Sequence, residues 1–227
     1  MIPHIDNNKN SRTRSLGLQI CFLVFAYFTS SNCMAVNADK QCSYQTYEWN
    51  TNDKKAVHYQ LINKKYKELT ADEVDDFTGC SVCEQDQRLI NIPTVKPFKV
   101  CYIIAPLLYE IITELVNRGQ VLNSITGYRV GRTRGDIDEK GNRTKFSNHS
   151  YGIAIDVNAA ENGLYDNCLS FNSNCRLIRG GRWVPGKSGS LTKDSETVQA
   201  LESMGLKWGG VMPGKQKDFM HFSPTGY

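Results

Sequence analysis

Two histidines and two aspartates in the second half of the chain are the residues best suited to metal chemistry. His149 lies in a polar loop seven residues before Asp156, and His221 lies three residues after Asp218. A catalytic zinc site uses three protein ligands, drawn from histidine and acidic side chains, and keeps a fourth position open. His149, Asp156 and His221 have that number and kind, and Asp218 would face the same ion if its segment turns.

The spacing of the first two candidates requires a bend in the chain. Seven extended residues span about 23 Å, whereas two ligands of one zinc ion lie about 3–4 Å apart. Gly152 lies between His149 and Asp156, and glycine bends at the lowest cost. Spacing alone leaves a second interpretation open, in which one histidine is a loop residue, the other is a partly buried terminal residue, and Asp156 caps a turn.

The segment that carries Asp156 has the alternation of a strand. Over residues 152–158, one face would hold the bulky side chains of Ile153, Ile155 and Val157. The other face carries glycine, alanine and the carboxylate, and therefore leaves space for a ligand beside Asp156.

The remaining pattern indicates a mixture of helices and short strands. The clearest helix is predicted from Pro106 to Arg118, with an apolar stripe and a glycine stop. Further helices are predicted over 194–204 and near 57–69, and a strand over 121–130. We expect an α+β domain with a small, mostly antiparallel sheet flanked by helices.

The N-terminal 38 residues have the pattern of an export signal. Basic residues precede the apolar stretch 16–28, which is shorter than the roughly 20 residues of a membrane span. We expect the mature chain to start at Asp39; lipidation of Cys33 and an uncleaved anchor are the alternatives. No later stretch is apolar enough to span a bilayer, so we expect a secreted or periplasmic protein.

Composition and charge exclude several classes of protein. Of 227 residues, 40% are hydrophobic and 22% charged, with 18 Gly and 7 Pro, which excludes collagen-like, coiled-coil and largely disordered chains. The net charge of +4 is too small to indicate a nucleic acid partner. We expect a monomer with one catalytic domain over 98–227, preceded by an extension over 39–97 whose role the sequence leaves open.

The extension contains an acidic cluster. Most of the cysteines that follow the signal lie in the extension or close to its end. After Thr70 the sequence predicts a solvated helix start closed by Glu73 in a capping box, with a calcium site as the alternative. Six of the eight cysteines follow the signal, which in an exported chain indicates disulfides. Cys168 and Cys175 are predicted to pair, because they bracket a short polar loop. The partners of four others are left open: Cys42, Cys80, Cys83 and Cys101.

Four motifs resemble those of a known family. The run SNHSYGIAID, residues 147–156, resembles the S-x-H-x-x-G-x-A-x-D signature of the zinc D-alanyl-D-alanine carboxypeptidases, a family that also contains L-alanyl-D-glutamate endopeptidases. Residues 218–222 resemble its closing acid-x-x-His-Phe motif, 206–210 its W-G-G motif, and 127–129 its G-Y-R motif. The resemblance implies the Hedgehog/DD-peptidase fold.

The resemblance also implies a cofactor and residue roles. The cofactor is Zn²⁺, and its implied ligands are His149, Asp156 and His221. Asp218 would be the general base that takes a proton from water and returns it to the leaving amine. Arg129 would bind a substrate carboxylate or the oxyanion, with a surface arginine as the alternative. Ser147 would donate a hydrogen bond to the substrate, with loop capping as the alternative.

The implied function is hydrolysis of the D-amino-acid-containing stem peptides of peptidoglycan, as a D-alanyl-D-alanine carboxypeptidase or an L-alanyl-D-glutamate endopeptidase. Val211 stands where endopeptidase-type relatives often have an acid, and the extension matches none of the motifs, so the substrate is less well indicated than the zinc chemistry. A non-catalytic zinc-containing binding module, as in Hedgehog signalling domains, is one alternative, but such a module needs no base at Asp218. A disulfide-stabilised secreted protein with incidental histidines is another.

Overall fold

The computed structural model describes residues 40–227. The export signal predicted over 1–38, including Cys33, lies outside the described residues. Within 40–227, no helix is long and apolar enough to cross a membrane.

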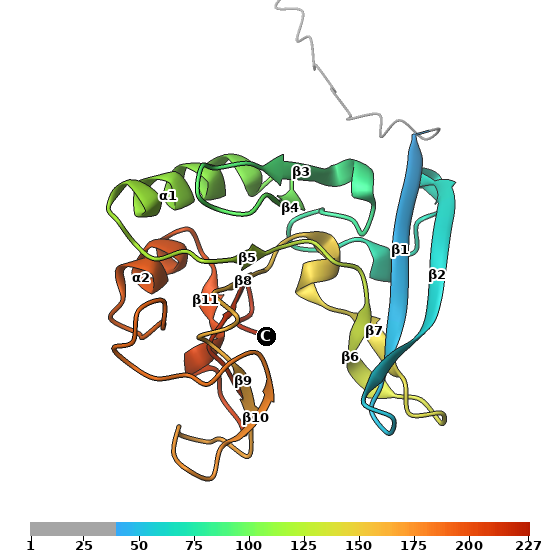
Figure 1. The fold of residues 1–227 in the computed structure, drawn as a ribbon. Helices are drawn as coiled ribbons and strands as arrows, with labels where there is room; N and C mark the ends of the chain where they lie inside the picture. Colours follow the sequence, from blue (N-terminus) through green and yellow to red (C-terminus); the bar gives the residue numbers. More distant parts are fainter. Residues whose placement is uncertain (1–39) are drawn as a thin grey trace, which may run out of the picture. The chain divides into compact units, whose positions relative to one another are not determined.

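The described chain contains two α-helices and thirteen mostly short strands (Figure 1). The helices are α1 (Ala105–Asn117) and α2 (Glu196–Ser203). The strands are β1 (Gln41–Asn50), β2 (Lys55–Lys65), β3 (Gln87–Ile90), β4 (Phe98–Cys101), β5 (Ile125–Thr126), β6 (Arg132–Ile137), β7 (Arg143–Phe146), β8 (Ile155–Val157), β9 (Leu164–Asp166), β10 (Arg176–Arg179), β11 (Lys207–Trp208), β12 (Lys217–Asp218) and β13 (His221–Ser223). Single 3-10 turns are η1 (Tyr66–Glu68), η2 (Ala71–Glu73), η3 (Glu84–Asp86), η4 (Asn148–Tyr151) and η5 (Gly209–Val211).

The predicted mixture of helices and mostly antiparallel strands is confirmed. Among residues 40–227 the strands form four small sheets, in the orders β2-β1-β6-β7, β10-β9-β12, β11-β13-β8-β5 and β3-β4. All strand pairs are antiparallel except β1 with β6, which meet in parallel at Glu48 and Arg132. The sequence predicted one sheet; most of these strands have only two to four residues, too few to extend a single ladder across the domain.

The main core lies between the two helices and the β11-β13-β8-β5 sheet. The buried stripe of α1 joins buried residues of α2 and of β8 and β13 in one apolar cluster. Its members include Leu108, Ile112, Val198, Ile155 and Phe222. Each such side chain contributes about 1.5–3 kcal/mol when it is fully buried. This core holds β8 and β13, the two strands that carry Asp156 and His221, in a fixed register.

Two of the predicted elements are wrong. Residues 55–65, where the sequence predicted a helix over 57–69, form β2, which pairs with β1 from Asn50–Lys55 to Gln41–Lys65. In the hairpin, the backbone groups of β2 form their hydrogen bonds with β1. A prediction from helix propensity takes no account of such a partner strand. The strand predicted over 121–130 is reduced to β5, because the backbone N–H groups of Tyr128 and Arg129 donate to the carbonyls of Lys99 and His149 and not to a strand of that sheet.

One disulfide lies within the extension, and a second ties the extension to the rest of the domain. Cys42 is bonded to Cys83 (S–S 2.04 Å) and Cys80 to Cys101 (2.06 Å). The second bond reaches the end of β4, beyond the boundary at 97 that the sequence suggested for the extension. The structure also brings together Cys168 and Cys175, at an S–S distance of 2.07 Å.

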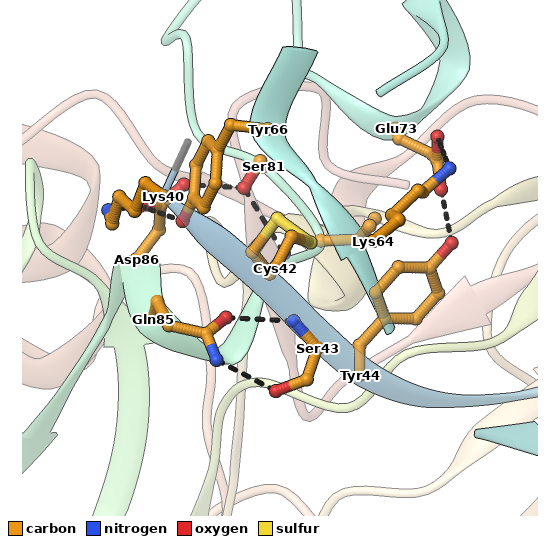
Figure 2. The surroundings of a disulfide bond; sticks show 12 residues. Lys40, Cys42, Ser43, Tyr44, Lys64, Tyr66, Glu73, Ser81, Gln85 and Asp86 are labelled. Carbon is orange, nitrogen blue, oxygen red and sulfur yellow. Dashed lines mark hydrogen bonds and ion pairs between the residues drawn. A yellow bond between two sulfur atoms is a disulfide. The ribbon is translucent and has the colours of Figure 1, made fainter. Parts of the chain in front are cut away.

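Buried carboxylates fasten the β1–β2 hairpin to the disulfide-bonded loop (Figure 2). Glu73 receives hydrogen bonds from Lys64 Nζ (2.5 Å), the Thr70 backbone N–H (2.8 Å) and the Tyr44 hydroxyl. The predicted capping box is present, but it closes one 3-10 turn, and Glu73 is 3% exposed rather than solvated. The reason is that Lys64 and Tyr44 come from the hairpin, which the sequence did not predict.

A second carboxylate repeats this arrangement near the start of β1. Asp86 is buried and accepts hydrogen bonds from Lys40 Nζ (2.9 Å), the Tyr66 hydroxyl (2.6 Å) and the Ser81 hydroxyl. Burial alone would raise the pKa of Asp86, but these donors outweigh it and lower the pKa. Charged hydrogen bonds of this kind contribute about 1.5–3 kcal/mol each, so the extension is an integral part of the fold.

Candidate metal centre

Three side chains from separate segments converge on one point. His149 Nε2 lies 3.1 Å from Asp156 Oδ1 and 3.2 Å from His221 Nδ1, and the last two atoms are 3.0 Å apart. The three residues are 2%, 7% and 3% exposed, respectively. Asp156 and His221 meet because they are directly opposite in the β8–β13 ladder.

His149 reaches the other two through the bend at Gly152. The η4 turn carries His149, and it ends at Gly152 with a left-handed φ of 70°. A Cβ at Gly152 would lie 2.0 Å from Gln87 Oε1 and 2.6 Å from the Cys101 backbone nitrogen. Only glycine fits this close approach. The Cys101 N–H also donates to the Gly152 carbonyl at 2.9 Å, so the disulfide-bonded end of β4 supports the turn from behind.

Hydrogen bonds outside the cluster orient two of the three groups. His149 Nδ1 lies 2.8 Å from the Gly127 carbonyl and can only donate to it, so the Nε2 lone pair points to the cluster. Arg129 Nη2 donates to Asp156 Oδ2 at 3.2 Å, which leaves Oδ1 directed inward. Both partners are typical of the support that ligands of a metal receive.

Burial and the neighbouring charges act in opposite directions on the groups of the cluster. Burial lowers the pKa of His149, although Asp156 acts in the opposite direction. Burial alone would raise the pKa of Asp156, but the charges and hydrogen bonds of His149 and His221 outweigh it and hold the pKa well below its usual range. At neutral pH Asp156 is therefore ionised and supplies one negative charge.

The donor set fits a divalent cation. In neutral His149 the proton is on Nδ1, which donates to the Gly127 carbonyl. The other nitrogen, Nε2, therefore has only a lone pair, and it lies 3.1 Å from Oδ1 of the ionised Asp156. Two acceptors facing each other in a buried site repel, and a cation between them removes that conflict. Two nitrogens and one oxygen 3.0–3.2 Å apart suit a zinc ion with bonds of about 2.0–2.2 Å. His149, Asp156 and His221 could thus hold a metal ion.

Asp218 lies on β12, one turn before His221. Its backbone pairs with Leu164 of β9, and the Phe219–Met220 turn leads directly to β13. Its Oδ1 atom is buried and has no hydrogen-bond partner within residues 40–227. Burial, followed by the charge of Asp156, raises the pKa of Asp218 to about 6, although His221 and two arginines oppose the shift. A carboxyl group with such a pKa can accept and return a proton near neutral pH.

The other two predicted site residues lie at different depths. Arg129 is partly exposed, and its backbone N–H donates to the His149 carbonyl at 3.1 Å. Ser147 is buried immediately before η4, with its Oγ 3.4 Å from Ser150 Oγ. Arg129 is therefore close to the three converging side chains, whereas the Ser147 hydroxyl lies against Ser150 within the loop.

Sequence reasoning missed two cationic residues near Asp218. Lys217 is buried, and its ammonium donates to three carbonyl oxygens of the preceding loop, those of Met212, Gly214 and Gln216. The second cationic residue is Arg134 on β6, whose positive charge acts to lower the pKa of Asp218. The alternation of Arg132 and Arg134 in the sequence was the only signal for the latter.

Comparison with known families agrees with this geometry. Residues 140–224 match the family model described as D-alanyl-D-alanine carboxypeptidase. Over this segment the chain is similar to that family. The matched segment contains all three converging residues and Asp218, and it begins after Arg129 and the disulfide-bonded extension. Searches among curated proteins and solved structures found no match.

Proposed function

We propose that the protein is a zinc-dependent metallopeptidase that acts on D-amino-acid-containing stem peptides of peptidoglycan, as a D-alanyl-D-alanine carboxypeptidase. The observation that carries the proposal is the buried triangle of His149, Asp156 and His221 within the segment that matches the peptidase family. The family model that matches residues 140–224 is described as D-alanyl-D-alanine carboxypeptidase, and this favours the carboxypeptidase over the L-alanyl-D-glutamate endopeptidase.

The zinc ligands in this proposal are His149 Nε2, Asp156 Oδ1 and His221 Nδ1. A bound zinc ion would supply the Lewis-acid chemistry that peptide hydrolysis requires. Asp218 accepts the proton of the attacking water and gives it to the leaving amine. Its raised pKa of about 6 makes both halves of this proton transfer accessible.

Arg129 has two roles in the proposal. One guanidinium nitrogen donates to the outer oxygen of Asp156 and fixes the orientation of that ligand. A guanidinium has five N–H donors, and Arg129 is partly exposed, so donors remain for the negative charge that develops on the substrate.

The setting of the enzyme is part of the same proposal. We propose the Hedgehog/DD-peptidase fold for residues 98–227, removal of the 1–38 signal, and action as a monomer in the periplasm or outside the cell. Three disulfides among residues 40–227 support an oxidising compartment, because cytosolic thiols are kept reduced. Peptidoglycan is accessible there.

Digestion of purified muropeptides by the zinc-loaded protein, followed by mass spectrometry, tests the proposal. We expect the loss of a terminal alanine from pentapeptide stems; cleavage after the sugar-linked L-alanine would show the endopeptidase instead. Asp218→Ala should retain zinc and lose most turnover. Asp194→Ala is the matched control, because Asp194 is an exposed acid at the start of α2. Equal activity in all three proteins would remove Asp218 from the mechanism.

A further inference from the structure

The segment 224–227, which follows β13, folds back onto the η4 turn. Asn148 Nδ2, from that turn, donates to Thr225 Oγ1 at 2.9 Å and to the backbone oxygen of Tyr227 at 2.5 Å. Asn148 immediately precedes His149 in the chain. Its amide group therefore connects the turn of one proposed ligand to the segment 224–227, which we call the strap.

The strap is also fastened to the strand that carries His221. Ser223 is the last residue of β13 and is fully buried, and its Oγ donates to the same backbone oxygen of Tyr227 at 3.0 Å. The Gly226 N–H donates to the Ser223 carbonyl at 3.2 Å, which closes the strap into a turn. One oxygen atom thus accepts hydrogen bonds from side chains next to two of the three proposed ligands.

The far side of the strap holds the loop that leads to the proposed base. The Tyr227 hydroxyl donates to the Pro213 carbonyl at 2.9 Å. Pro213 lies between η5 and β12, and β12 ends at Asp218. The strap therefore spans from the His149 turn to the loop before Asp218.

Close packing brings the strap and Asp218 against the same residue. Gly209 begins η5, and a Cβ built on it would lie 3.2 Å from Asp218 Cβ and 3.3 Å from the Gly226 carbonyl oxygen. The same Cβ would lie 2.6 Å from the Asp218 backbone oxygen, so a side chain at Gly209 would displace β12. The missing side chain lets the strap and the proposed base pack together.

We propose that the strap fixes the position of Asp218 relative to the His149 turn, with Asn148 and Tyr227 as its positioning residues. This inference rests on the proposed peptidase function. Asp218 can take a proton from the attacking water only within hydrogen-bond reach of it. A displacement of about 1 Å can reduce a rate about 100-fold, so a segment that connects the two sides of the site matters to turnover.

Two substitutions loosen the two ends of the strap separately. Asn148→Ala removes both donors at the His149 turn, and Tyr227→Phe removes only the hydroxyl that holds Pro213. Asn148→Gln keeps the amide donors and should recover part of what Asn148→Ala loses. If Asn148→Ala misfolds, Asn148→Gln replaces it.

Matched controls lose similar hydrogen bonds in the β1–β2 hairpin and the turn after it. The Asn50 amide donates to the Lys140 carbonyl at 2.9 Å and to Asn142 Oδ1 at 2.8 Å, and the Tyr66 hydroxyl donates to Asp86 at 2.6 Å. Asn50→Ala and Tyr66→Phe should lower Tm and change zinc affinity and kcat by less than about twofold. They separate a loss of stability from a loss of positioning.

Zinc affinity reports the end of the strap at the His149 turn. We expect Asn148→Ala to weaken zinc binding about 10-fold, since groups that orient a ligand typically contribute 10-fold to 100-fold. Tyr227→Phe should change zinc affinity by less than about twofold, because its hydroxyl holds the loop before Asp218. Competition with a chelator of known affinity measures both.

Kinetics at saturating zinc report the position of Asp218. With an N-acetylated peptide ending in D-Ala-D-Ala, kcat should fall about 10-fold in Asn148→Ala and in Tyr227→Phe, with KM within about twofold of the wild type. The double variant should lose less than the product of the two single losses, because both residues act through one strap.

Each result supports or overturns one part of the account. Wild-type hydrolysis with kcat losses no larger than those of the controls, or with single losses that multiply in the double variant, would overturn the strap and leave the proposed function standing. No hydrolysis by the wild type, together with the expected loss of zinc affinity in Asn148→Ala, would overturn the proposed function and support the connection of the strap to the His149 turn.

Discussion

Asp156 and His221 face each other across the β8–β13 ladder, with Asp156 Oδ1 3.0 Å from His221 Nδ1. A slip of the ladder by one residue would turn one of them to the opposite face of the sheet. The buried core side chains of Ile155 and Phe222, adjacent to them in sequence, prevent such a slip. The same hydrophobic pattern that forms the core thus fixes two of the three proposed ligands.

Replacement of the central carboxylate should weaken metal binding strongly. Asp156→Asn keeps the size of the side chain and the hydrogen-bonding capacity of one oxygen, but it removes the negative charge that both histidines face. We expect zinc affinity to fall by more than about 100-fold, since even outer partners of ligands typically contribute 10-fold to 100-fold. Competition with a chelator of known affinity measures this loss, and unchanged affinity would contradict the ligand assignment.

The bend at Gly152 should be intolerant of any side chain. Gly152→Ala combines a left-handed φ of 70° with a Cβ placed 2.6 Å from the Cys101 nitrogen. Gly186→Ala is the matched control, because its φ is 82° and a Cβ there meets nothing within 4 Å. We expect the control to lower stability by about 1 kcal/mol and Gly152→Ala to lower it by more, with loss of zinc. Thermal unfolding and zinc content measure both; equal effects would show that the contact with Cys101 is unimportant.

The acid limb of the pH profile should report Asp218. The carboxylate accepts a proton only when it is ionised, so kcat/KM should rise as pH increases through the Asp218 pKa. That pKa is about 6 without metal, and a bound dication would lower it, so the limb should lie at or below about 6. In Asp218→Ala the residual activity should lose this limb. An identical limb in the variant would assign it to another group.

The metal-free protein gives an independent measure of the same carboxyl group. Because its folded pKa is raised above the usual 3.8, ionisation of Asp218 destabilises the fold as pH rises from about 4 through about 6. Metal-free Asp218→Asn should therefore be more stable than the wild type at pH 8 and equally stable below pH 4. Denaturant unfolding at the two pH values measures the difference, and a wild type that is the more stable at pH 8 would show that Asp218 is favourably paired.

The disulfide behind the η4 turn should affect the metal site as well as stability. Cys101 supports Gly152 through a backbone hydrogen bond of 2.9 Å. Replacing both Cys80 and Cys101 by alanine should lower Tm and weaken zinc binding, whereas replacing both Cys168 and Cys175 should lower Tm with zinc affinity unchanged. Removal of a native disulfide typically costs about 2–5 kcal/mol. Equal zinc affinity in the two double variants would show that the extension does not support the site.

Local signals predicted the elements that local interactions determine. Pro106 begins an apolar helical stripe and Gly119 follows it with a φ of 77°, so α1 was found within a residue of its observed ends. The hairpin was missed because β2 exists through its pairing with β1, a contact between two segments that the helix prediction for residues 57–69 did not consider. The buried states of Glu73 and Asp86 follow from that same hairpin and were equally inaccessible to sequence reasoning.

The candidate site also contains residues that a local motif predicts and residues that depend on contacts between distant segments. The long motif around His149 and Asp156 predicted a cluster that the structure brings together, because each of its residues has one defined place in the turn and strand. Arg134 has no such motif. Its effect on Asp218 depends on how the fold places β6 and β12, which only the three-dimensional structure reveals.

The central claim is that one zinc ion is bound by His149, Asp156 and His221. Anomalous diffraction from crystals of the zinc-loaded protein at the zinc absorption edge tests it most directly. We predict a single strong peak about 2.0–2.2 Å from His149 Nε2, His221 Nδ1 and Asp156 Oδ1. A zinc peak elsewhere, or none at these three atoms in a crystal grown with excess zinc, would contradict the account.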